Sequence, residues 1–134
     1  MTLLVRHARA GSRKRWRGDD LLRPLDEDGL RRASELVELL AGYEITSIVS
    51  SPAIRCVQTV EPLALARGLV VEHRAGLGEV EQSSGGRDLV RAVAGSATLI
   101  CGHGGLEHSL SGAPRFRKGA VLVFDEALHV HATL

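Results

Sequence analysis

Short apolar runs that alternate with helix-like segments limit this chain to an α/β fold. Four of the runs, each long enough for one buried strand, cover residues 2–6, 45–49, 69–73 and 97–101. Alternation of this kind is typical of parallel sheets whose connecting helices pack on the two faces. The sequence therefore predicts an α/β three-layer sandwich with a mostly parallel central sheet flanked by helices. Further strands are expected at residues 120–124 and 128–133.

The helix between the first two strands is expected to be amphipathic. Pro24 and Asp26 mark its start, and apolar residues then recur at spacings of three and four, as on one side of a helix. These residues are Leu30, Ala33, Val37 and Leu40. We therefore expect the four to form its apolar face.

The helix after the second strand carries a capping signal and an internal proline. Ser51 is expected to cap it and Pro52 to be its first residue, because a proline N–H would be unpaired there in any case. Pro62 is expected to kink or divide this helix. Shorter helices are expected at residues 88–94 and 105–111, and residues 8–23 and 75–87 are predicted to be loops.

Length and composition fit one domain over residues 1–134 and exclude several classes of protein. The net charge is +1, which gives no reason to expect nucleic acid or a charged membrane as a partner. Cys56 and Cys101 lack metal-ligand spacing and predict reduced thiols in a cytoplasmic protein. No apolar run approaches the ~20 residues of a membrane span, and no signal peptide is expected. The sequence favours no oligomeric state.

Three of the expected strands end in residues that suit an anion. Arg6 and His7 end the first, Arg55 lies one turn beyond the second, and His103 with Gly104 follows the last of the four. The carboxyl ends of parallel strands meet at one edge of a sheet. Forked arginine N–H groups match phosphate oxygens, and glycines allow the backbone to approach a ligand. The sequence therefore predicts a phosphate site at this edge.

These segments resemble the histidine phosphatase (phosphoglycerate mutase-like) superfamily. In order along residues 3–105, the similar segments are VRHARAGS, SSPAIRCVQTVEPLA, GLGEVEQ and CGHGG. The short length and RPLDEDG are most similar to the small bacterial phosphohistidine phosphatases, and also to the phosphatase domain fused to Nudix hydrolases in actinobacteria. The resemblance implies a phosphoglycerate mutase-like fold and hydrolysis of phosphomonoesters or phosphoramidates.

The resemblance also implies a metal-independent mechanism without a cofactor. His7 would attack phosphorus to form a phosphohistidine intermediate, since a neutral imidazole is a good nucleophile near pH 7. Arg6, Arg55 and His103 would bind the phosphoryl oxygens and spread their charge in the transition state. Taken on its own, Arg55 could instead be a helix-surface arginine paired with Glu61.

Further roles implied by the resemblance fall on the loops. Glu79 would protonate the leaving group, a role that favours a carboxyl pKa raised toward neutrality, and Glu81 is the alternative proton donor. Arg9, Ser12 and Gly104 are further candidates for contact with the phosphate. Ala8 stands where the family signature has glycine. Only the two loops could cover the site, so we expect it to be open.

An open site favours a phosphohistidine protein as substrate. The alternatives are a small phosphorylated metabolite, such as a nucleotide or sugar phosphate, and a non-catalytic module that binds phosphate without turnover. The basic run SRKRWRG from Ser12 to Gly18 contains Trp16 and could also bind nucleic acid, but two acidic residues follow it. We therefore expect no nucleic-acid partner and no membrane partner.

Overall fold

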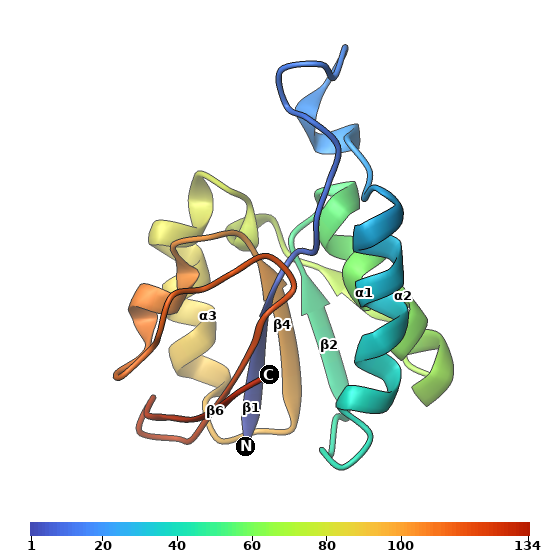
Figure 1. The fold of residues 1–134 in the computed structure, drawn as a ribbon. Helices are drawn as coiled ribbons and strands as arrows, with labels where there is room; N and C mark the ends of the chain where they lie inside the picture. The colour runs from blue at the N-terminus through green and yellow to red at the C-terminus, as the bar shows by residue number, and fades with distance from the viewer.

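The strands form one six-stranded sheet in the order β3-β2-β4-β1-β5-β6 (Figure 1). The computed structural model describes residues 1–134. The strands are β1 (Thr2–Arg6), β2 (Ser47–Ser50), β3 (Val71–His73), β4 (Thr98–Gly102), β5 (Val121–Phe124) and β6 (Val130–Thr133). Strands β1 to β4 pair in parallel, and β5 runs antiparallel to both of its neighbours. The prediction of a mostly parallel sheet is thus confirmed.

Helices cover both faces of this sheet. The helices α1 (Glu27–Leu39) and α2 (Ile54–Arg67) lie on one face, and α3 (Gly85–Val93) lies on the other (Figure 1). Short 3₁₀ turns occur at Asp20–Leu22, Ala75–Leu77, Glu81–Ser83 and Leu106–Ser109. The last of these replaces the helix expected over residues 105–111, and α3 begins at residue 85 rather than at residue 88. None of the helices combines the length and apolar character needed to cross a membrane.

The alternation of side chains along β1 explains why the sheet needs a layer on each side. Leu3 and Val5 pack in the apolar cluster beneath α1 and α2. Leu4 points the other way, into the cluster beneath α3. All three side chains are fully buried, as expected for a strand in the middle of a sheet that is covered on both faces.

Helix α1 buries a face displaced from the predicted one. The Asp26 side chain caps it by accepting a hydrogen bond from the Gly29 backbone N–H at 2.9 Å. Gly29, Ala33, Leu36 and Leu40 are buried, whereas Leu30 is 47% exposed. The prediction for Leu30 is wrong because Gly29 lies directly against the Arg9 backbone, where a side chain at residue 29 would collide. That close contact sets the rotation of the helix.

Helix α2 differs from its prediction at both prolines. It begins at Ile54 rather than at Pro52, and its N-cap residue Ala53 offers no side-chain hydrogen bond. The Ser51 hydroxyl accepts from the Ala53 backbone N–H at 3.3 Å and also contacts Nε2 of His103 at 2.9 Å. Because the N-cap residue is Ala53, the prediction that Ser51 is the N-cap is wrong. Pro62 does not divide the helix, which continues to Arg67. Buried residues of α2 on both sides of Pro62, among them Val60 and Leu63, pack in one core cluster.

Candidate active site

The register of β1 and β4 brings the two predicted histidines together. Arg6 pairs with Gly102 in this parallel ladder, so His7 and His103 each follow the last residue of adjacent strands. The His7 backbone N–H also donates to the Gly102 carbonyl at 3.0 Å. The two imidazole rings lie edge to face, with centroids 5.4 Å apart and planes at 66°. Residues that are far apart in sequence thus face each other at one end of the sheet.

His7 has the protonation state of a nucleophile. Its Nδ1 lies 2.8 Å from the Ala8 carbonyl, and a carbonyl can only accept, so Nδ1 carries the proton and the Nε2 lone pair is free. Burial, with the nearby charges of His103, Arg55 and Arg6, outweighs the hydrogen bond to Ala8 and lowers the pKa of His7 to about 3. The ring is therefore neutral at pH 7.

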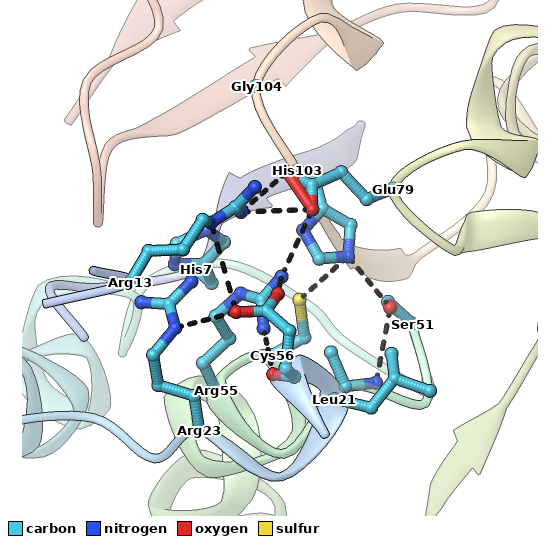
Figure 2. Close-up of polar contacts among 12 residues, drawn as sticks. His7, Arg13, Leu21, Arg23, Ser51, Arg55, Cys56, Glu79, His103 and Gly104 are labelled. Atoms are coloured by element: carbon cyan, nitrogen blue, oxygen red, sulfur yellow. Dashed lines mark hydrogen bonds and ion pairs between the residues drawn. The ribbon is translucent and has the colours of Figure 1, made fainter. Parts of the chain in front are cut away.

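His103 is held from two sides. Its Nε2 contacts the Ser51 hydroxyl at 2.9 Å and the Cys56 sulfur at 3.6 Å (Figure 2). The buried side chain of Gln82 accepts from the His103 backbone N–H at 3.0 Å and donates to the Gly104 carbonyl at 2.9 Å. The ring atom Nδ1 of His103 has no hydrogen-bond partner. The ring is therefore fixed in place while one of its nitrogens stays available.

Arg6 lies flat against the loop that carries His103. Its Nη1 donates to the Phe116 carbonyl at 2.8 Å. A Cβ at Gly104 would lie 3.0 Å from Cζ of Arg6, so a side chain at residue 104 would crowd the guanidinium. The Nε atom of Arg6 is buried without a hydrogen-bond partner. A buried donor of this kind is costly unless a ligand satisfies it.

Arg55 is buried beneath two carboxylates. Its side chain is 1% exposed, which excludes a helix-surface arginine. Its Nη2 lies 3.3 Å from an oxygen of Asp20 and 3.3 Å from an oxygen of Glu79, and its Nη1 donates to the Asp20 carbonyl at 2.9 Å. In the free protein, carboxylate oxygens therefore contact the N–H groups that a phosphoryl group would use.

Glu79 lies between two guanidinium groups, as Figure 2 shows. Nη2 of Arg13 donates to its two oxygens at 2.8 and 3.0 Å. Burial raises the pKa of Glu79, but the hydrogen bond and charge of Arg13, with the charges of His103 and Arg55, outweigh it and the pKa falls below its usual range. The expectation of a raised pKa is thus wrong for the free protein, in which Glu79 is ionised.

A cavity of about 370 Å³ lies beside His7, Arg6, His103 and Glu79, whereas Arg55 does not line it, because its buried side chain lies behind Asp20 and Glu79. It is lined by Arg6, His7, Ala10, Gly11, Ser12, Arg13, Arg23, Glu79, His103, Gly104 and Lys118. Of the predicted site residues, Arg9 lies outside the cavity because Asp26 and Asp28 bind its guanidinium at 3.0 and 3.2 Å. Glu81 is also outside, and its carboxylate folds back over Gly78.

The sequence reasoning missed four polar residues at this site. Arg13, Arg23 and Lys118 line the cavity, and Gln82 holds the His103 loop. Arg23 is buried and donates to the Gly11 carbonyl at 2.7 Å and to Asp20 at 3.0 Å. Arg23 lies in RPLDEDG, Arg13 in SRKRWRG and Gln82 in GLGEVEQ, all of them segments already singled out in the sequence. Nothing local to Lys118 indicates that it lines the cavity.

Ala8 fits where the resembling family has glycine. Its side chain packs with Leu25 and Ala33 in a small apolar cluster. Its backbone N–H donates to the Thr59 hydroxyl at 2.9 Å, and that hydroxyl donates to the Arg55 carbonyl at 2.7 Å. The methyl group therefore points away from the cavity, and this departure from the signature leaves the site intact.

We predict that His7 makes the fold sensitive to acid. Below its unfolded pKa of 6.5 the unfolded chain binds a proton that the folded chain, with a pKa of about 3, rejects. Stability from this group is complete above pH 6.5 and is lost as the pH falls toward 3, at about 1.4 kcal/mol per pH unit. The free energy of unfolding, measured with urea, should fall between pH 7 and pH 4 by about 3 kcal/mol less in His7→Asn than in wild type. Equal losses would contradict the assignment.

The sequence matches one family of known proteins over most of its length. Residues 2–84 match the histidine phosphatase superfamily (branch 1). The 8-oxo-(d)GTP phosphatase of Mycolicibacterium smegmatis is 47% identical over 62 residues, which cover 46% of this chain and 19% of that protein. The match therefore spans about a fifth of that relative's length.

Solved structures with the same fold cover the whole sheet. The protein histidine phosphatase SixA complexed with tungstate has a TM-score of 0.79 and 20% identity, over 99% of this chain and 95% of that chain. A protein of Agrobacterium tumefaciens assigned as phosphohistidine phosphatase SixA has a TM-score of 0.77 and 23% identity, over 99% and 96% of the two chains. These similarities confirm the expected phosphoglycerate mutase-like architecture.

Proposed function

This chain belongs to the histidine phosphatase superfamily, and we propose that it is a phosphatase whose nucleophile is His7. The observation that carries the proposal is the state of that ring. It is neutral, Nδ1 is tied to the Ala8 carbonyl, and Nε2 is free beside a cavity lined with cationic groups. We further propose that residues 1–134 form one catalytic domain that uses neither a metal nor a cofactor.

In the proposed reaction, Nε2 of His7 attacks phosphorus as the bond to the leaving group breaks. The phosphoryl group is then held on His7, and the leaving atom takes up a proton. Water attacks the phosphohistidine, which releases inorganic phosphate and restores the free ring. Arg6, Arg55 and His103 stabilise the charge on the phosphoryl oxygens during both steps. The unpaired Nε of Arg6 and Nδ1 of His103 support this role.

Glu79 is the proposed proton donor to the leaving group, in preference to Glu81. A bound phosphoryl group would compete with the Glu79 carboxylate for Arg55 and Arg13. Once those contacts are exchanged, the main causes of its lowered pKa are removed and the carboxyl can take up a proton. Substrate binding thus converts Glu79 from a ligand of arginine into an acid.

Glu79→Gln should test both proposed roles of this residue, as a carboxylate that binds arginine in the free protein and as a proton donor when substrate is bound. Turnover of an alkyl phosphate, which has a poor leaving group, should fall on the order of 10²-fold or more, whereas p-nitrophenyl phosphate should lose much less. Inorganic phosphate should inhibit the variant more strongly than wild type, because one of the two carboxylates that contact Arg55 is removed and only Asp20 remains. Steady-state kinetics with both substrates and phosphate as inhibitor test this. Equal losses on both substrates would rule out a proton donor, and Glu81→Gln is the matched control.

The first proposed substrate is phosphohistidine in a cytoplasmic partner protein. The likeness in fold to SixA, a protein histidine phosphatase, supports it. A tetrahedral oxyanion, tungstate, is bound in that related structure. The second candidate is a nucleotide, which the 47% identity to part of an 8-oxo-(d)GTP phosphatase favours. Inorganic phosphate release from a phosphohistidine protein and from a panel of nucleotides decides between them, and p-nitrophenyl phosphate tests for turnover by either route.

A further inference from the structure

We propose that residues 12–22, here called the basic arm, dock an acidic segment of the phosphorylated protein beside the active site. The proposal rests on the proposed function, because it assumes a protein substrate for the same cavity. The basic arm leaves the sheet at the carboxyl end of β1 and projects beyond both helical layers (Figure 1). It therefore lies where the remainder of a protein substrate would have to pass.

The basic arm carries positive charges that nothing in the structure neutralises. Lys14, Arg15 and Arg17 are exposed, and none of them forms an ion pair, whereas Arg13 is paired with Glu79 and lines the cavity. The acidic residues of the arm are occupied locally. Asp19 accepts from the Leu21 backbone N–H at 3.0 Å, and Asp20 contacts Arg23 and Arg55. The outer surface of the arm is thus complementary to acidic side chains.

The same arm exposes three large apolar side chains. Trp16, Leu21 and Leu22 are 37%, 49% and 58% exposed. The Trp16 ring is held in place, because its N–H donates to the Asp19 carbonyl at 2.9 Å. Trp and Arg are enriched at protein interfaces, and a partner that covers the two leucines would bury further apolar surface.

A second, more apolar hollow joins this surface to the active site. It has a volume of about 220 Å³, and its walls include Trp16, Pro24 and Leu25. It shares Gly11, Ser12 and Arg23 with the active-site cavity. A partner segment whose phosphohistidine reaches His7 could therefore place one apolar side chain in this hollow.

A protein fits these features better than a nucleotide does. A small ligand would fill the catalytic cavity and the hollow, and would leave Leu21, Leu22 and the outer charges without a role. An acidic segment with one apolar side chain uses the hollow and the outer charges, and the rest of the partner protein can cover the two leucines, which lie outside the hollow. A single-stranded nucleic acid would use the arginines and Trp16 but would have no use for the two exposed leucines.

The test compares two synthetic peptides that each contain one phosphohistidine. One is flanked by Asp and Glu with a single Leu, and the other has Gln and Ser at those positions. Wild type should hydrolyse the acidic peptide with a kcat/KM roughly tenfold higher, and salt should reduce the preference. The K14Q/R15Q/R17Q variant should lose the preference, Trp16→Ala should weaken it, and both should turn over p-nitrophenyl phosphate at the wild-type rate.

Matched controls keep the outcomes distinct. Arg91→Gln alters one exposed arginine on α3 and should leave the preference intact, whereas Arg15→Gln should reduce it. A preference that survives in the triple variant would overturn the docking proposal, as would tighter binding of an oligonucleotide than of the acidic peptide. Failure of the proposed function itself would show differently. Hydrolysis of nucleotides but of neither peptide would count against a protein substrate, and p-nitrophenyl phosphate turnover that persists in His7→Ala would count against the nucleophile.

Discussion

His7→Ala should lower the turnover of p-nitrophenyl phosphate on the order of 10⁴-fold or more, because it removes the atom that bonds to phosphorus. The effect should appear in kcat. Arg6, Arg55 and His103 remain in the variant, so inorganic phosphate should still bind. The fold should also persist, since His7 lies at the end of β1 rather than in either apolar cluster. Circular dichroism and phosphate-induced thermal stabilisation provide the checks.

The covalent step can be observed directly. Wild type, mixed briefly with ³²P-labelled substrate and denatured in alkali, should carry label that is stable to base and labile to acid, as expected of a phosphoramidate. His7→Ala should carry none. The control is His129→Ala, which should label normally. His129 is exposed and directly precedes β6, the edge strand opposite β3. If His7→Ala carried label or kept most of its activity, the proposal that His7 is the nucleophile would be wrong.

His103→Ala should reduce kcat by on the order of 10²- to 10³-fold, the loss expected on removing one preorganised donor to the transition state. His103 is already held in position in the free protein, because Ser51 and Gln82 contact it while its Nδ1 has no hydrogen-bond partner. Little reorganisation is therefore needed when the transition state forms. The contribution should therefore be larger in the transition state than in substrate binding. We expect KM for p-nitrophenyl phosphate to change much less than kcat.

Two companion variants show whether this loss comes from charge stabilisation. Ser51→Ala keeps the ring but removes one of its supports, so its loss in kcat should be smaller than that of His103→Ala. Phosphohistidine labelling in His103→Ala should still be detectable, with both formation and hydrolysis slowed. If KM rose while kcat stayed constant, His103 would contribute ground-state binding only, and its proposed role would be wrong.

The local features of the fold were predictable because they depend on short-range periodicity. The buried runs at the start of β1 and β4 identified both strands, and each strand ended near the predicted residue. The presence of a helix around residue 33 was equally clear from its apolar spacing. Its rotation was not, since Leu30 is exposed by a contact between Gly29 and the Arg9 backbone that no periodicity encodes.

The candidate site also contains residues that local sequence predicted and contacts that it could not predict. His7, His103 and Arg55 stood out because each follows a strand that was itself predictable. The pairing of Glu79 with Arg13 was not predictable, since it joins two loops that are 66 residues apart in sequence, and it reverses the expected shift in the pKa of Glu79. Gln82 was missed for a similar reason, because its role comes entirely from contact with the loop of His103.

The sequence by itself determined the alternating α/β layers and which histidines and arginines lie at the strand ends, because apolar periodicity and strand termini are local properties. Only the tertiary structure decided which nitrogen of His7 is free and that the Ser51 hydroxyl contacts His103. It also decided that Glu79 is ionised, through its contacts with Arg55 and Arg13. Those outcomes depend on burial and on charges brought close by the folded chain, and neither can be read along the sequence.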